Sequence, residues 1–119
     1  MKEYKEYEVW QGTEKIASHI GLADSFFSRF RGLMLKKSLD SGEGLLLKNC
    51  SSIHCFFMRF TIDAVYLDKE MSVVAVECVK PWRIGGFYKG AKHVLELEEG
   101  RGTLLRTGEK IYLKERNDK

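Results

Sequence analysis

Short stretches in which β-branched and aromatic residues alternate with polar ones recur along this chain, and they predict β-strands. The expected strands cover residues 6–11, 15–19, 44–48, 62–67, 72–79, 94–97 and 110–113. Gly12-Thr13 and Asp68-Lys69-Glu70 separate neighbouring pairs of strands and predict hairpin turns, the second without the usual glycine. Segment 84–90 carries three glycines and predicts a loop.

One amphipathic segment interrupts the strands. Asp24 or Ser25 can cap a helix, and Phe26, Phe30 and Leu33 then recur at helical spacing. We therefore expect a mostly β fold of the α+β class: a small barrel-like or sandwich domain with about seven strands and one short helix near residues 25–35. A chain of 119 residues suits a single domain over residues 1–119, with a polar tail at 115–119 that frays.

Charge and composition limit the classes of partner. The net charge is only +3, so the chain lacks the basic surface that nucleic-acid binding requires. Its apolar runs are too short to span a membrane, and the first residues are charged rather than typical of a targeting segment. Three cysteines without a leader favour reduced thiols in the cytoplasm. We expect no nucleic-acid partner, no membrane partner, and a monomer or weak dimer.

The stretch from Cys50 to Asp63 concentrates reactive residue types, with two of the three cysteines and one of the three histidines. Cys50, His54 and Asp63 are the candidate catalytic residues, because a thiolate needs an imidazole beside it and a third group to orient the ring. If residues 50–54 were extended, Cys50 and His54 would lie roughly 13 Å apart. The alternative is that His54 is a polar residue at a strand entrance, hydrogen-bonded to backbone.

Cys50, His54 and Cys55 are also zinc-ligand types, and Cys78 would make a fourth. The stretch contains neither a CxxC nor an HxxxH spacing, so we expect no metal and no cofactor. Cys55 and Cys78 adjoin bulky apolar residues and are expected to be buried and unreactive. Cys50 precedes two serines and is expected to be the most accessible thiol.

Asp63 is unusual because aspartate disfavours strands and residues 62–67 otherwise predict one. By alternation it shares a side with Val65 and Leu67, and a buried carboxylate needs partners. Arg59, Arg83 or backbone amides can serve. Asp63 is therefore either a structural hydrogen-bonding group or a ligand-binding residue, and we expect the structural role.

The segment from Pro81 to Gly90 combines aromatic residues, an arginine and glycines, which is typical of binding loops. Trp82 can offer a flat apolar face, and Arg83 can bind an anion through two hydrogen bonds. The alternative is that Trp82 packs on the end of the barrel and Arg83 is solvated. The candidate ligand-binding residues of the whole chain are His54, Asp63, Trp82, Arg83 and Tyr88.

Several segments, taken in order, resemble the Domain of Unknown Function 192 family. The matching pieces are Arg31-Gly32-Leu33-Met34 with Leu39, Glu43-Gly44-Leu45-Leu46-Leu47, Phe56-Phe57-Met58, Ile62-Asp63-Ala64-Val65-Tyr66-Leu67-Asp68, Val73-Val74-Ala75-Val76, and Val94-Leu95-Glu96-Leu97 with Gly100. They extend over about residues 26–113. The resemblance implies a compact, β-rich, barrel-like domain with one short helix, and it implies no activity.

The leading functional hypothesis is a domain that binds a small polar ligand or a peptide, near Cys50 to Met58, Asp63 and the loop from Pro81 to Tyr88. A second hypothesis is a hydrolase or transferase that uses His54, Asp63 and a cysteine. A third is an interaction module that presents the Phe-rich helix to a protein partner. Binding is favoured over catalysis because the sequence lacks a complete catalytic signature.

Overall fold

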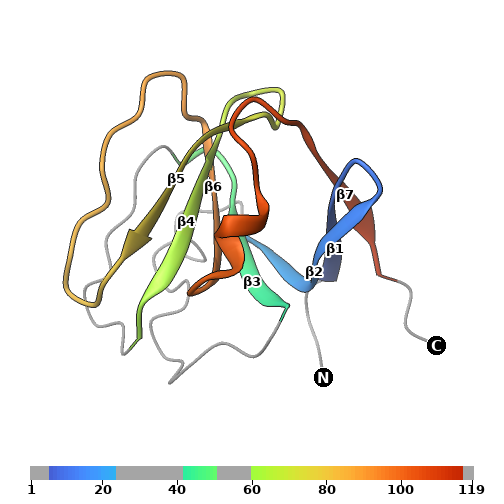
Figure 1. Cartoon of the computed structure of the whole chain (residues 1–119), viewed down its shortest axis with the longest axis horizontal. Helices are drawn as coiled ribbons and strands as arrows, with labels where there is room; N and C mark the ends of the chain where they lie inside the picture. Colours follow the sequence, from blue (N-terminus) through green and yellow to red (C-terminus); the bar gives the residue numbers. More distant parts are fainter. Residues whose placement is uncertain (1–5, 24–41, 51–59, 117–119) are drawn as a thin grey trace.

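The computed structural model describes residues 6–23, 42–50 and 60–116 (Figure 1). These residues form seven strands and one short 3₁₀ turn: β1 (Glu6–Gln11), β2 (Glu14–Ala23), β3 (Glu43–Leu47), β4 (Ile62–Leu67), β5 (Val73–Val79), β6 (His93–Glu98), η1 (Arg101–Leu104) and β7 (Ile111–Glu115). All seven predicted strands are present, and the mostly β fold class is confirmed. The helix expected near residues 25–35 lies outside the described residues.

The seven strands form one sheet in the order β5-β4-β6-β3-β2-β1-β7. Neighbours are antiparallel except for β2 and β3, which run parallel. Within the described residues the strands form one mixed sheet that is not a closed barrel. Its two ends meet where β5 and β7 begin: Ser72 and Lys110 form a bridge, and backbone hydrogen bonds join Val73 to Gly108 and Glu109 and Ile111 to Met71.

Strand β2 is longer than its sequence pattern predicted. The expected strand ended at residue 19, whereas β2 continues to Ala23. Its second half pairs with β3 in register from His19 opposite Glu43 to Ala23 opposite Leu47. Since this pairing joins segments that are distant in sequence, local alternation does not reveal it.

The hairpin between β4 and β5 confirms the turn predicted without glycine. Asp68 accepts hydrogen bonds at Oδ1 from the backbone N–H groups of Glu70 and Ser72, both at 2.9 Å. Met71 takes the positive φ, 68°, that glycine usually provides. The aspartate side chain therefore organises the turn, as is common for this residue type.

Both faces of the central sheet are covered, and the two apolar clusters lie on opposite sides. Cluster one contains Val9, Ile16, Ala17, Ile20, Leu46, Val65, Leu67, Val73, Leu95, Leu97, Leu105 and Ile111. Cluster two contains Leu47, Ile62, Ala64, Tyr66, Val79 and Val94. Every residue of β4 is consequently buried. Asp63 on β4 and Glu96 on its neighbour β6 are thus removed from water, although they lie on different faces.

Gly44 allows β3 to lie close to β6. A Cβ atom at this position would collide with the backbone carbonyl oxygen of Glu96 and would press on Ile20 and Leu97 at 3.0 and 3.1 Å. Only glycine fits this contact without a shift of backbone. The approach places β3 directly beside the part of β6 that carries Glu96, where Leu45 pairs with it.

Candidate functional site

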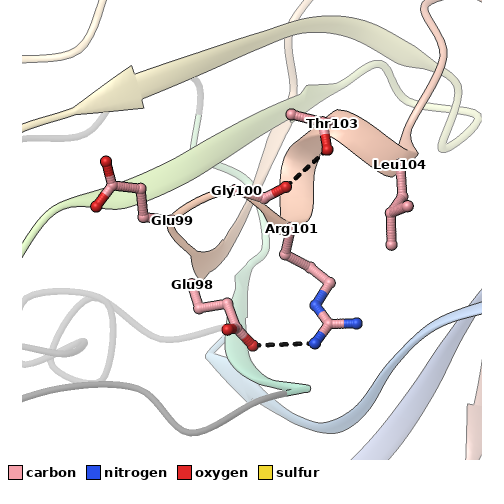
Figure 2. Close-up of a pocket in the computed structure, with 6 residues that line it drawn as sticks. All are labelled: Glu98, Glu99, Gly100, Arg101, Thr103 and Leu104. Carbon is pink, nitrogen blue, oxygen red and sulfur yellow. Dashed lines mark hydrogen bonds and ion pairs between the residues drawn. The ribbon is translucent and has the colours of Figure 1, made fainter.

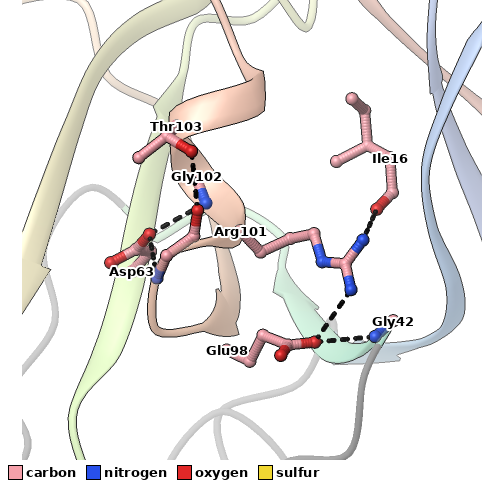
Figure 3. Close-up of polar contacts among 8 residues, drawn as sticks. Ile16, Gly42, Asp63, Glu98, Arg101, Gly102 and Thr103 are labelled. Carbon is pink, nitrogen blue, oxygen red and sulfur yellow. Dashed lines mark hydrogen bonds and ion pairs between the residues drawn. The ribbon is translucent and has the colours of Figure 1, made fainter.

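Asp63, on β4, lies on the cluster-one face and is a structural hydrogen-bonding group. Its Oδ2 accepts hydrogen bonds from the backbone N–H groups of Gly100 at 2.9 Å and Gly102 at 2.8 Å (Figure 3). The residue is only 5% exposed. A Cβ at Gly102 would lie 2.8 Å from the same oxygen, so the turn needs glycine there. Of the partners that we anticipated, backbone amides are the ones that bind it.

A second polar network lies beside this turn. Glu98 accepts from the N–H of Gly42 at 2.8 Å and pairs with Arg101 at 3.2 Å, while Arg101 also donates to the Ile16 carbonyl at 3.4 Å (Figure 3). These groups border an open depression of about 230 Å³ (Figure 2). Its lining residues are Glu98, Glu99, Gly100, Arg101, Thr103 and Leu104. None of our predicted site residues lines it, and its one cation is already paired.

The two described cysteines reverse the predicted order of exposure. Cys50 is half-buried and packs against cluster two, whereas Cys78 is exposed. The prediction that Cys78 is buried is wrong, because β5 is an end strand and is only partly covered on the cluster-one face, where Cys78 lies. Val76, on the same face of β5, is 37% exposed. His54 and Cys55 lie outside the described residues.

The catalytic alternative requires a cysteine, His54 and Asp63 to meet. Cys50 packs on one face of the sheet and Asp63 on the other. Cys78 does lie opposite Asp63 on the neighbouring strand, but partial desolvation by its surroundings and then the nearby carboxylate of Asp63 raise the pKa of its exposed thiol. A raised pKa lowers the thiolate fraction at neutral pH, so this thiol is not activated for nucleophilic chemistry.

The three predicted binding residues of the loop that follows β5 differ in their exposure. Trp82 is 58% exposed, and Arg83 is exposed as well. Tyr88 instead turns inward, packs against cluster two, and donates its hydroxyl hydrogen bond to Glu77 at 3.1 Å. Asp63 lies on the opposite face from Tyr88. The structure therefore does not gather Asp63, Trp82, Arg83 and Tyr88 around one cavity.

Glu77 organises the cluster-two side of β5. Its Oε1 accepts three hydrogen bonds: from the hydroxyls of Tyr66 and Tyr88, each at 3.1 Å, and from the N–H of Gly86 at 2.9 Å. The two tyrosine rings are tilted by 46° with centroids 4.5 Å apart. Burial, and then the charge of Glu77, raise the pKa of Tyr88.

Glu96 is the most unusual side chain of the described structure. It is 5% exposed, and its Oε1 finds no hydrogen-bond partner among the described parts of the chain. Burial raises the pKa of this carboxyl from 4.5 to about 8, so the neutral acid predominates at pH 7. Buried polar atoms almost always have a partner, so an unpartnered one needs an explanation.

Glu96 and Glu77 belong to a single row of the sheet. Ala64 on β4 pairs directly with Glu77 on β5 and with Glu96 on β6. Directly paired residues project from the same face, so both acids stand on the cluster-two side with a small alanine between them. Two strand spacings separate their backbones by roughly 10 Å. We call this set the Glu77–Ala64–Glu96 row.

Sequence reasoning missed Glu77, Glu96 and Tyr66 as site residues. The alternation of Glu96 and Glu98 with Leu95 and Leu97 is typical of a strand with one face in water. A signal was nevertheless present, since the continuous apolar run of β4 is typical of a strand that is buried on both faces. It becomes informative about Glu96 only when the pairing of β4 with β6 is known.

The described residues contain neither a metal-binding cluster nor a helix that could span a membrane. Among them, no group of three histidines, cysteines, aspartates or glutamates is arranged to hold a metal ion. This leaves the zinc expectation untested, because His54 and Cys55 are not described. No helix in the described parts of the chain is long and apolar enough to cross a membrane.

Two solved structures share the fold. A protein of unknown function from Novosphingobium aromaticivorans matches with a TM-score of 0.75 at 15% identity, covering 90% of this chain and 83% of that one. A putative transcription regulator from Sinorhizobium meliloti matches with a TM-score of 0.73 at 16% identity, covering 95% and 97%. At these identities the likeness concerns the fold alone.

Curated relatives are more similar in sequence. A UPF0127 protein from Thermococcus sibiricus is 38% identical over 97 residues, which are 78% of this chain and 59% of the relative. A UPF0127 protein from Pyrococcus abyssi is 34% identical over 110 residues, 86% of each chain. The chain thus spans less than two thirds of the length of the Thermococcus relative. The model of the uncharacterized ACR family DUF192 matches residues 8–112, and the chain belongs to this family.

Proposed function

We propose that this domain binds a small ligand with a polar head group, which docks at the Glu77–Ala64–Glu96 row. The observation that carries the proposal is the buried Glu96 carboxyl with its unpartnered Oε1. An unsatisfied buried polar atom costs about 1–3 kcal/mol. A ligand that supplies the missing hydrogen bond recovers this free energy on binding.

The surroundings of Glu96 define the chemistry of the head group. A neutral carboxyl donates one hydrogen bond and accepts others, so it complements a group with a donor and an acceptor side by side, such as a primary amide or a carboxylic acid. The cross-strand neighbours Leu45 and Ala64 are apolar, and Val94 lies on the same face. These side chains favour an apolar body attached to the polar head, as in most small-molecule sites.

Glu77 supports the site from the other end of the row. The bonds from Tyr66, Tyr88 and Gly86 hold its carboxylate in one position. Rigid polar groups bind ligands with a smaller entropic cost than mobile ones. Tyr88, which the sequence marked as a ligand-binding residue, acts in this proposal by positioning Glu77.

A titration with acetamide and with benzamide, followed by the backbone amide signals in NMR spectra, tests the proposal. We expect shifts that centre on Leu45, Ala64 and Glu96 and saturate with one constant for each compound. Glu96→Gln keeps a donor and an acceptor, so it should retain binding. Glu96→Leu removes both at similar volume and should abolish the shifts.

Stability separates a binding role from a purely structural one. If Glu96 serves a ligand, Glu96→Leu should fold and resist denaturant at least as well as wild type, because a buried polar group has been replaced by an apolar one. Glu98→Gln, on the same strand, is the matched control for binding. Because Glu98 already has partners within the domain, this variant should show the same ligand-induced NMR shifts as wild type. Loss of the fold in Glu96→Leu, or unaltered amide binding in it, would refute the proposal.

A further inference from the structure

Residues 80–92 form the loop that connects β5 to β6 (Figure 1). Three large apolar side chains of this loop are exposed. Trp82 is 58% exposed, Ile84 67% and Phe87 85%. Apolar residues scattered singly over a surface are ordinary, but three within six residues form a patch of the kind found at interaction sites. We call these three residues the loop patch.

The loop is held in place rather than loosely attached. Its middle is anchored to β5, because Gly86 N–H and the Tyr88 hydroxyl both donate to Glu77. Its end is anchored to β4, because Lys92 N–H donates to the Leu67 carbonyl at 2.7 Å. The exposed side chains are therefore presented by a preorganised loop, which lowers the entropic cost of binding a partner.

The backbone at Trp82 is strained. Its φ is +66°, a conformation that costs a non-glycine residue about 1 kcal/mol or more. The strain is borne by a tryptophan that is more than half exposed. Strained positions of this kind cluster at sites that bind partners.

Charge distinguishes the kind of partner. Lys80, Arg83 and Lys89 are exposed on the loop, and the sequence has no aspartate or glutamate from residue 78 to residue 95. Glu77, which lies just before the loop in the sequence, already accepts hydrogen bonds from Tyr66, Tyr88 and Gly86. The outer side of the loop is thus apolar and positive, which is complementary to a surface that is apolar and negative.

The adjoining strand offers backbone groups to such a partner. Strand β5 ends the sheet, and Val73 occupies part of its outer edge by bonding Glu109 and Gly108. No other described strand pairs with the rest of that edge. An extended peptide can pair with both the N–H and the C=O groups of an open strand edge.

We infer that the loop patch and the outer edge of β5 together bind an extended peptide segment of a partner protein, with acidic and apolar side chains. The apolar side chains pack on Trp82, Ile84 and Phe87, and the acidic ones lie near Arg83 and Lys89. The loop is joined to the Glu77–Ala64–Glu96 row through Glu77, but the peptide contacts other side chains and the inference requires no ligand at Glu96.

The test uses a fluorescein-labelled peptide that alternates glutamate with leucine, and fluorescence anisotropy as the readout. We expect saturable binding that weakens as salt is raised, because the charged part of the contact is screened. A peptide with lysine in place of glutamate should not bind. Trp82→Ala keeps the same positive φ and should weaken binding at least about tenfold, as should Arg83→Glu.

Matched exposed residues elsewhere serve as controls. Tyr112→Ala removes an aromatic side chain that is 54% exposed on β7, and Arg106→Glu reverses a side chain that is 61% exposed. Both should bind like wild type, and all variants should keep its melting temperature. Phe87→Ala, at the most exposed position, replaces Trp82→Ala if that variant does not fold.

Three results would overturn the inference. The first is an absence of peptide binding, and the second is an equal loss of binding in the control variants. The third is Trp82-dependent binding to phosphatidylserine vesicles without peptide binding, which would identify the loop patch as a membrane-contact surface instead.

Discussion

Replacing Asp63 by asparagine tests how the β6–η1 turn is attached to the sheet. Asparagine has nearly the same shape but carries no charge. The carboxylate accepts from Gly100 and Gly102 at 2.9 and 2.8 Å, on a residue that is 5% exposed. Charged hydrogen bonds to backbone donors contribute more than neutral ones, and burial strengthens them.

The magnitude follows from these two bonds. A hydrogen bond to a charged group contributes about 1.5–3 kcal/mol, against about 1 kcal/mol for a neutral pair. Two bonds that each change from charged to neutral should therefore cost about 2 kcal/mol. Asp63→Ala leaves both donors without an acceptor, one of them fully buried, and should cost about 3 kcal/mol or more.

Asp68 provides a matched comparison. Its carboxylate also accepts two backbone N–H groups, both at 2.9 Å, but it lies in the solvent-accessible β4–β5 turn. Asp68→Asn should therefore cost only about 0.5 kcal/mol, because water replaces what the charge provided.

Urea denaturation of the wild type and the three variants, fitted with a common slope, gives the free energies of unfolding. Equal costs for Asp63→Asn and Asp68→Asn would refute the argument that burial strengthens the Asp63 bonds. An unchanged or raised midpoint for Asp63→Asn would refute the structural role itself and would promote Asp63 to a functional residue.

Three further predictions follow from single positions. Burial raises the pKa of Glu96 from 4.5 to about 8, so as the pH rises the unfolded chain loses this proton before the folded protein does. The free energy of unfolding should therefore fall by a few kcal/mol between about pH 4.5 and 8, and Glu96→Gln should remove this pH dependence in urea melts. Maleimide should modify exposed Cys78 before half-buried Cys50, most rapidly at alkaline pH because partial desolvation and Asp63 raise the Cys78 pKa; faster labelling of Cys50 would contradict the assignment. Gly44→Ala should cost about 3 kcal/mol or abolish folding, since its Cβ would meet the Glu96 carbonyl, and a normal melting temperature would disprove this close contact.

Local sequence determined the strands and turns. Alternating apolar residues and the Gly12-Thr13 turn are recognised within a few positions, and they predicted β1 and the start of β2. Asp68 bonds only to residues two and four positions away, so its turn is also encoded locally. The apolar residues around Asp63 likewise predicted that its carboxylate needs partners.

The tertiary structure decided the identity of those partners and the location of the site. Asp63 bonds to amides 37 and 39 residues away, and no local pattern specifies such a contact. Cys78 has valine neighbours like a core residue, yet it is exposed because the sheet happens to end at β5. Burial depends on what covers a strand, and that information is not contained in the strand itself.

Glu96 is the clearest case in which strand pairing, and not local sequence, decides the environment of a side chain. In β6, Glu96 alternates with leucines, and this pattern taken alone predicts a side chain that faces solvent. Pairing with β3 and β4 instead removes it from water and places it across Ala64 from Glu77. The sequence determined that a carboxyl stands at this position of a strand, whereas the pairing of distant strands made it a buried, neutral acid, because desolvation depends on neighbours that only the folded sheet brings together.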